Sequence, residues 1–157
     1  MKYRMLTKEQ FSELHPEFIN FLASQTISKN EWDTIKKEKP EVAQQELEIF
    51  SDLVWEGVLK EVKYLDNSSP QQLFLFKIDE EEMKLIVVKV KDDSKDISTN
   101  DGLQWLQNNL NHETVEIFTA SKKYSANKNQ DIFNLIEQGA SISKGGLFEA
   151  IHKTLPA

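Results

Sequence analysis

Apolar residues in the first third of the chain recur at the spacing of amphipathic helices. Phe18, Phe21 and Leu22 lie at positions i, i+3 and i+4, which places them on one face of a helix. Each such group follows residues that favour a helix start, either a capping box or a proline in the first turn. These residues are Thr7 with Gln10, Pro16, Ser28 with Glu31, and Pro40. The pattern predicts a helical part over about residues 1–57.

The clearest helical pattern follows Pro40. Its apolar residues lie within a narrow arc at about 100° per residue: Ala43, Leu47, Phe50 and Val54. Gly57 suits the position just after a helix, where a positive φ is common, and so favours an end there. Residues 58–65 would extend the helical stripe, yet they also alternate as a strand does. We favour the strand, because Gly57 is a natural terminator and the following segment needs a pairing partner.

The middle of the chain predicts a β-hairpin. Residues 66–70 have the composition of a turn. Two apolar runs of strand length follow, at residues 73–78 and 85–90, and the acidic residues 79–82 make a hairpin the simplest connection between them. Both runs are apolar on both faces, so we expect both faces of the sheet to be covered at least in part.

Helical and strand patterns alternate in the last third of the chain. The expected elements are a helix capped by Asn100 or Asp101, a strand at 115–119, an exposed basic loop at 122–130, a helix capped by Asp131 that ends at Gly139, and a last helix around 147–151. The third and fourth strands flank a helix. If these strands are neighbours, they should therefore be parallel, with a right-handed crossover.

Together these patterns predict the fold class α+β. A helical N-terminal third should precede a small mixed sheet, built from a three-strand meander, a crossover helix and a fourth strand, with two closing helices. The length of 157 residues fits one domain. We therefore expect a single domain over 1–157, with a helical part at about 1–57 and a sheet-containing part at about 58–157.

Composition narrows the compartment and the partners. The chain has no cysteine, which excludes disulfides, thiolate zinc sites, iron–sulfur clusters and a cysteine nucleophile. The net charge of −7 and the single arginine, Arg4, disfavour nucleic acid as a partner. No apolar run reaches the about 20 residues of a membrane span, and the first residues lack the apolar stretch of a signal peptide. We therefore predict a cytoplasmic protein without membrane association.

One segment combines features of an anion site. Glycines, hydroxyls and a lysine precede the last helix: Ser141, Ser143, Lys144, Gly145 and Gly146. Free backbone N–H groups, a helix dipole and a positive charge together favour phosphate binding, although the order of residues is not that of a P-loop. A simpler interpretation is also open, in which a glycine ends one helix and a serine caps the next.

Other catalytic or metal-binding patterns are weak. Glu82 and Lys84, with Asp79 as partner, have the spacing of a metal-dependent nuclease site, but they lie at a turn and a strand start. The three histidines, His15, His112 and His152, are not at metal-ligand spacing from one another. We therefore predict no catalytic residue, no metal site and no cofactor.

Several segments of the chain resemble a known family. They are Met1-Lys2-Tyr3-Arg4 and residues 18–23, 50–59, 69–76 and 142–145. The chain is similar over these segments to a set of small uncharacterised proteins of Bacteroidetes-type bacteria, a domain of unknown function. The resemblance spans essentially the whole chain and implies a bacterial cytoplasmic protein with a single domain. It implies no activity, cofactor or catalytic residue.

Three functions are compatible with these observations. The first is a non-enzymatic protein-interaction or regulatory module that binds another protein or forms a homodimer, with exposed apolar residues of the helical part, including Trp32, as its contact surface. The alternative is a binder of small molecules or nucleotide phosphates at Ser141–Gly146. The third is a nuclease-like fold without a convincing active site.

Overall fold

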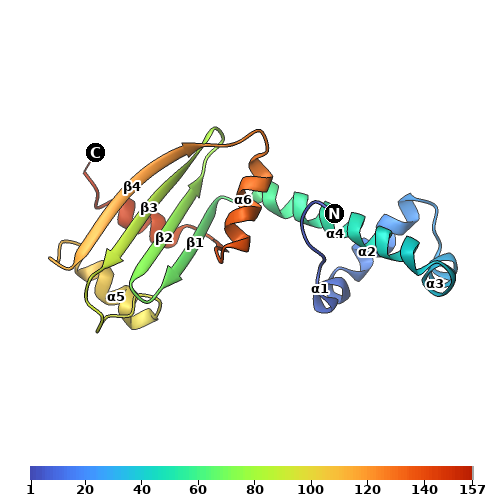
Figure 1. The fold of residues 1–157 in the computed structure, drawn as a ribbon, viewed down its shortest axis with the longest axis horizontal. Coiled ribbons are helices and arrows are strands. Elements are labelled where there is room, and N and C mark those ends of the chain that lie inside the picture. The colour runs from blue at the N-terminus through green and yellow to red at the C-terminus, as the bar shows by residue number, and fades with distance from the viewer. Residues whose placement is uncertain (157) are drawn as a thin grey trace. The chain divides into compact units, whose positions relative to one another are not determined.

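The chain folds into a helical unit and a sheet unit (Figure 1). The computed structural model describes residues 1–156. The helical unit comprises Met1–Lys60 and the sheet unit Glu61–Ala157. The α+β class and the helical N-terminal part are thus confirmed, whereas the organisation as a single domain stays a prediction. Within the described residues, each helix is too short or too polar to span a lipid bilayer.

The helical unit begins with the predicted capping residues. Its helices are α1 (Lys8–Glu13), α2 (His15–Ser24), α3 (Lys29–Glu38) and α4 (Pro40–Glu61). Thr7 and Gln10 form both hydrogen bonds of a capping box at α1. At α3 the Ser28 hydroxyl accepts a hydrogen bond from the backbone N–H of Glu31. The predicted starts of these helices are therefore confirmed, because each depends on hydrogen bonds between residues close in the chain.

Aromatic rings form the core of the helical unit. The Phe18 ring lies 5.0 Å from that of Phe50 and 5.3 Å from that of Trp32, in edge-to-face arrangements. Only 7% of Trp32 is exposed. The expectation that Trp32 is an exposed contact residue is therefore wrong: helical spacing placed its ring on the apolar side of α3, where the core covers it.

Helix α4 is longer than expected. It continues past Gly57 to Glu61, and the first strand begins only at Tyr64. The positive-φ glycines of the described chain are Gly139 and Gly145, so Gly57 adopts no conformation that would end a helix. The favoured strand at 58–65 is therefore wrong, because the helical stripe continues.

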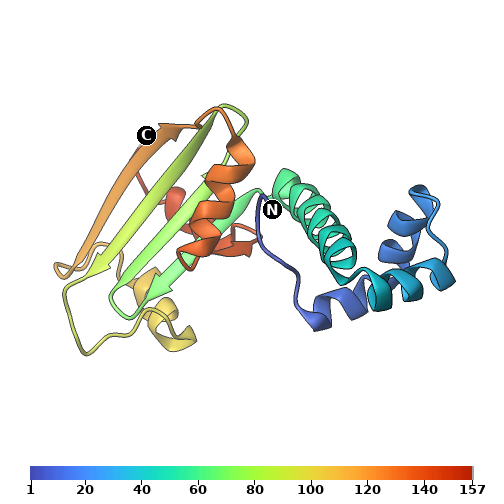
Figure 2. The same ribbon diagram turned by 45° about the vertical axis from the view of Figure 1, so that its right-hand side comes forward.

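The sheet has five antiparallel strands (Figures 1 and 2). They are β1 (Tyr64–Ser69), β2 (Gln72–Ile78), β3 (Glu82–Val90), β4 (Val115–Lys123) and β5 (Ser141–Ser143), in the spatial order β4-β3-β2-β1-β5. The three-strand meander and its hairpin are as predicted. The predicted mixed sheet is wrong, because the fourth strand lies antiparallel to the third. Val90 at the end of β3 pairs with Val115 at the start of β4, so the connection through α5 returns to the same end of the sheet.

Strand β1 occupies residues that resemble a turn. Asp66 pairs with Leu75 of β2 on one side and with Ser141 of β5 on the other. The turn itself lies at residues 70–71. Pairing on both sides holds residues of low β propensity in a strand, and a single segment of sequence does not reveal such neighbours.

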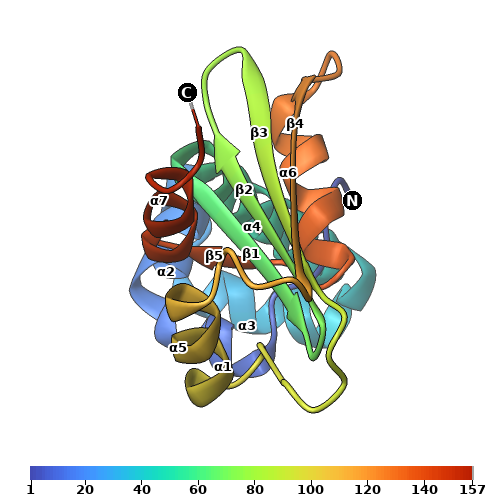
Figure 3. The same cartoon turned by 90° about the vertical axis from the view of Figure 1, so that its left-hand side faces the viewer.

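Helices cover the two faces of the sheet unequally (Figure 3). On one face α5 (Asn100–Asn108) and α7 (Gly146–His152) pack over an apolar core. This core includes Leu73, Leu75, Ile86, Val88, Leu106, Phe148 and Ile151. On the other face lies α6 (Lys128–Glu137), on the side of β1 and β2 (Figure 2). The expected partial covering of both faces is confirmed.

Two helix starts and one loop differ from expectation. Thr99, rather than Asn100 or Asp101, caps α5, and Asn127, rather than Asp131, caps α6. The basic loop is shorter than expected, because β4 continues through Lys123. At both helix starts several neighbouring polar residues are able to cap the helix, and the tertiary fold selects which of them does so.

Candidate functional site

The α6 face of the sheet carries apolar side chains that are only partly covered. Strand register places these side chains in two rows across three strands: Phe74 with Val87 and Phe118, and Phe76 with Leu85 and Ala120. We call these six residues the open sheet face. Phe118 is 49% exposed, and the four residues on β2 and β3 are half-buried. An apolar surface of this kind on a folded protein is typical of a binding site.

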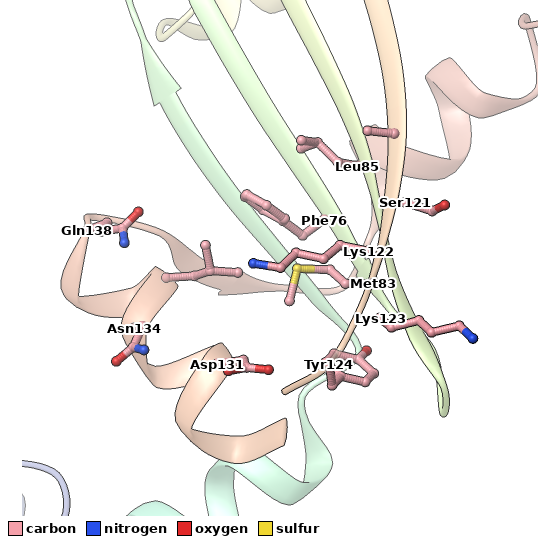
Figure 4. A pocket seen from close by; sticks show the side chains of 12 residues that line it. Phe76, Met83, Leu85, Ser121, Lys122, Lys123, Tyr124, Asp131, Asn134 and Gln138 are labelled. Carbon is pink, nitrogen blue, oxygen red and sulfur yellow. The ribbon is translucent and has the colours of Figure 1, made fainter. Parts of the chain in front are cut away.

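A groove of about 410 Å³ lies between the open sheet face and α6 (Figure 4). Phe76, Met83 and Leu85 form its floor, and Leu135 and Asn134 of α6 form the opposite wall. The groove exists because α6 leaves the sheet surface beyond β2 uncovered. Its size lies within the range of about 300–1,000 Å³ that is usual for ligand sites.

Lys122 supplies the positive charge of the groove. Lys122 and Met83 form the next pair on the same face, beyond the row of Leu85 and Ala120. The Lys122 side chain reaches across the floor toward α6, whereas Ser121 and Lys123 point away (Figure 4). Within the described part of the chain Lys122 forms no ion pair. The groove can therefore receive an apolar group that carries a carboxylate beside it.

Tyr124 closes one end of the groove and is not poised for proton transfer. Its hydroxyl oxygen lies 2.6 Å from the carbonyl oxygen of Asp79 and 3.1 Å from that of Glu82. Burial, followed by the nearby carboxylates of Asp79, Asp131 and Glu82, raises the pKa of Tyr124 to about 12. The phenol therefore stays protonated at neutral pH and ties β4 to the β2–β3 turn.

Asp131 on α6 is occupied by a local contact. Its carboxylate accepts hydrogen bonds of 2.7 Å from both the backbone N–H and the hydroxyl of Ser125. This carboxylate keeps its negative charge but is held by Ser125, and it forms no ion pair with Lys122 in the described chain. The charged side chain that reaches over the groove floor is therefore a cation.

The Ser141–Gly146 segment lies elsewhere on the sheet unit, and its groups have structural partners. Ser141–Ser143 forms β5, and the Ser143 hydroxyl donates a 3.0 Å hydrogen bond to Asp66. Burial, opposed by this hydrogen bond, raises the pKa of Asp66. Gly145 adopts φ +83° and packs against the Tyr64 ring. Gly146 starts α7 and Lys144 is exposed. An anion site here stays a prediction. Of the simpler interpretation, Gly139 with its positive φ follows the end of α6 as expected, but the serine cap is wrong: Gly145 caps α7, because Ser141 and Ser143 are held in β5.

The residues of the nuclease pattern come together only in part. The Lys84 amine lies 3.5 Å from an Asp79 carboxylate oxygen. The described residues contain no group of three histidine, aspartate or glutamate side chains that could hold a metal ion.

The three histidines occupy separate elements. His15 begins α2, His112 lies 5.6 Å from the Trp105 ring, and His152 stacks on Phe148 at 5.7 Å. Each has its own local surroundings, so the fold does not assemble them into one site.

Reasoning from the sequence missed the groove. Its one available signal was that both hairpin strands are apolar on both faces, which requires a covering element on each face. That pattern does not show how far α6 extends over the sheet, and this extent decides which apolar residues stay exposed.

The chain belongs to a family of unknown function, DUF6495, which matches residues 1–156. This match confirms the predicted resemblance to a domain of unknown function, whereas the Bacteroidetes origin stays a prediction. No curated protein and no solved structure matches the chain. The geometry of the sheet unit is therefore the basis for assigning a function.

Proposed function

We propose that this family member is a non-enzymatic protein-interaction module that binds through the open sheet face and the adjoining groove of the sheet unit. The observation that carries the proposal is the contrast between the two faces of one sheet. The face under α5 and α7 is buried, while Phe118 on the other face is 49% exposed. An exposed aromatic residue that adjoins other apolar residues and a groove, rather than standing alone, favours an interface.

The charges near this surface define the partner chemistry. The Lys122 amine reaches over the groove floor, and the Lys89 amine lies 5.6 Å from the centre of the Phe118 ring. A complementary segment presents an aromatic or aliphatic side chain next to a carboxylate. Aromatic anchors in desolvated pockets dominate binding energy, and the charges at the rim select the partner.

The contact surface proposed here replaces the one expected around Trp32. A ring that the core covers contributes to stability rather than to recognition, so we assign recognition to the sheet unit. We also propose that the protein acts in the bacterial cytoplasm. The complete absence of cysteine is compatible with a reducing compartment and supports this assignment.

Paired surface variants test the proposal. Phe118→Asp places a charge on the open sheet face, and Ile142→Asp makes the same kind of change at an exposed strand residue, 50% exposed, on the opposite edge of the sheet. Partners cross-linked to the tagged protein in its native lysate are identified by mass spectrometry and then purified. We expect binding of the purified partner to weaken at least about tenfold, or about 1.4 kcal/mol, in Phe118→Asp only.

Equal binding by wild type and both variants, with unchanged circular dichroism, would overturn the proposal. Lys122→Glu serves as a second variant, since it reverses the charge at the groove without inserting a polar group into apolar surroundings. A partner that also binds this variant with unchanged affinity does not use the groove.

A further inference from the structure

Strand β4 is a long and unpaired sheet edge. It has nine residues and stands at one end of the strand order, bonded to β3 alone (Figures 1 and 3). The opposite edge is β5, which has only three residues. Long free edges are templates for further strands, and proteins commonly keep unpaired edges short. Among the described strands, β4 is therefore the one suited to accept another strand.

The hydrogen-bonding groups that face outward from β4 are known from its pairing with β3. The Thr114 carbonyl accepts a 2.8 Å hydrogen bond from the Lys91 N–H, so even-numbered residues direct their backbone groups toward β3. Successive residues of a strand alternate in this respect. The free N–H and C=O groups along the edge consequently belong to odd-numbered residues, among them Ile117, Thr119 and Ser121.

We propose that two copies of the chain pair through β4 in antiparallel fashion about Thr119, which joins their sheets into one. The inference rests on the proposed function, because it names a second copy as the occupant of the open sheet face. In this register Thr119 faces Thr119 of the second copy. Ile117 faces Ser121 of the second copy, so outward-facing groups meet each other at every hydrogen-bonded position.

The charges of β4 are complementary to themselves in this register. Glu116 stands opposite Lys122 of the second copy, and the symmetry of the dimer repeats the pair. The Lys122 side chain, which reaches toward α6 in the single chain, turns toward the new strand to meet this glutamate. Lys122 lacks an ion-pair partner within its own described chain, while Glu116 contacts Lys91. Opposite charges directly across two strands stabilise their pairing. Pairing about Phe118 or Ala120 instead would place Glu116 opposite Ala120 or Tyr124. The register about Phe118 would also align Lys123 with Glu113, but Glu113 lies before β4, so within the strand the charges select Thr119 as the centre.

The same register covers the exposed aromatic residue. Phe118 stands opposite Ala120 of the second copy, and the two Phe118 rings lie diagonally across the symmetry axis, about 7–8 Å apart at the backbone and within reach of each other. Ala120 and Lys122 both line the groove. The second copy therefore adds its Phe118 and Glu116 to the open side of each groove, and this pair has the apolar and acidic chemistry that the groove requires.

A single cysteine provides a direct test, because the chain has none of its own. Residues of a hydrogen-bonded antiparallel pair have Cα atoms about 5.5 Å apart, within the range of about 4.4–6.8 Å for a disulfide. We expect Thr119→Cys to form a disulfide-linked dimer in the presence of oxidised glutathione. Ser121→Cys is the matched control, since its two copies would lie roughly 13 Å apart along the strands. Equal cross-linking of the two variants, or none, would overturn the register.

Charge reversal tests the same register without a covalent bond. Sedimentation equilibrium of the full chain should show a monomer–dimer equilibrium, which Glu116→Lys or Lys122→Glu alone weakens about tenfold or more through two like-charge contacts. The double variant Glu116→Lys with Lys122→Glu should restore dimerisation. Failure of the double variant to recover, while both single variants are weakened, would overturn the pairing.

A backbone variant keeps the test independent of side chains. Thr119→Pro removes an N–H that faces outward from β4 and so leaves the bonds to β3 intact. We expect a folded monomer. If the wild-type chain is itself monomeric at about 100 µM, far above the dissociation constants of specific interfaces, the proposed dimer is overturned. The proposed function would still be supported in that case if Phe118→Asp loses a heterologous partner.

Discussion

The helical unit and the sheet unit are stabilised in different ways. In the helical unit the helix caps join residues three positions apart, and aromatic rings fill one core. In the sheet unit decisive contacts join residues far apart in the chain, as between Tyr64 and Glu149, which are 85 positions apart. The helical unit buries the ring of Trp32 in its aromatic core, although Ile49, Leu53 and Val58 of α4 are exposed. The sheet unit instead leaves an aromatic residue, Phe118, exposed on a strand with a free edge. Under the proposed function, the aromatic core of the helical unit therefore supplies stability, while recognition depends on the sheet unit.

The largest expected effect comes from the aromatic core of the helical unit. Phe50 is 4% exposed and lies against the rings of Phe11, Phe18 and Phe21. Phe50→Ala removes these contacts and leaves a cavity, so we expect a loss of about 3–5 kcal/mol in the free energy of unfolding. Urea unfolding followed by circular dichroism measures this loss.

Phe118→Ala is the matched control for Phe50→Ala, with an expected change below about 1 kcal/mol because the ring is half exposed. Similar losses in the two variants would contradict the contrast between the units. Hydrogen exchange in Phe50→Ala sharpens the comparison further. A single domain predicts faster exchange in the sheet unit as well, whereas unchanged protection there would show that the two units unfold separately.

The second effect concerns backbone geometry in the sheet unit. Gly145 has φ +83°, and an added Cβ would lie 2.4 Å from carbon atoms of the Tyr64 ring. Both the left-handed backbone and the contact disfavour a side chain, so Gly145→Ala should destabilise the protein by about 1–3 kcal/mol. The shift of the urea midpoint at constant slope measures it. A variant as stable as wild type would show that α7 can move away from Tyr64 at no cost.

The third effect has the opposite sign and lies in the helical unit. Gly57 is within α4, and nothing lies within 4 Å of an added Cβ. Alanine has the higher helix propensity, so Gly57→Ala should stabilise the protein by about 0.5–1 kcal/mol. Thermal unfolding under the same buffer as for Gly145→Ala measures the difference. Destabilisation would indicate that residue 57 ends the helix in solution, as its sequence context favours.

The smallest effect is the pH dependence of a contact within the sheet unit. The Tyr64 hydroxyl donates a 2.7 Å hydrogen bond to Glu149, and the Lys77 amine lies 3.0 Å from the same oxygen. These two contacts lower the pKa of Glu149 below its ordinary value of 4.5. Their contribution to stability is therefore complete above pH 4.5 and is lost as the pH falls through the lowered pKa.

Glu149→Gln should consequently lose less stability than wild type between pH 6 and pH 3. We expect a difference within about 1 kcal/mol, because the pair is partly exposed to solvent. Melting temperatures of the two proteins at both pH values measure it. An identical acid dependence in wild type and variant would show that other carboxylates dominate the response.

Some features of both units could be predicted from the local sequence. Thr7 and Ser28 begin helices as predicted, because a capping hydrogen bond needs only a backbone N–H three residues further along the chain. The hairpin of β2 and β3 was equally predictable, since its two apolar runs are separated by a short acidic turn. These features depend on neighbours in the sequence.

The candidate site depended on packing that no pattern in the chain reveals. The hydrophobic pattern showed that β2 and β3 are apolar on both faces, yet only the position of α6 decides that Phe118 is exposed and that Lys122 reaches over a groove. The Ser143 hydroxyl likewise donates a hydrogen bond to Asp66, which is 77 positions away, a contact that the local sequence does not show.

The sequence alone was therefore sufficient for the α+β class, the helix starts of the N-terminal part, the hairpin and the absence of cysteine chemistry. The tertiary structure alone decided the end of α4, the antiparallel sense of β4, the strand character of residues 66–69 and the burial of Trp32. The physical reason is the range of the interactions. Helix caps and tight turns are satisfied within a few residues, whereas strand pairing and the burial of a side chain are set by partners that the local sequence does not specify.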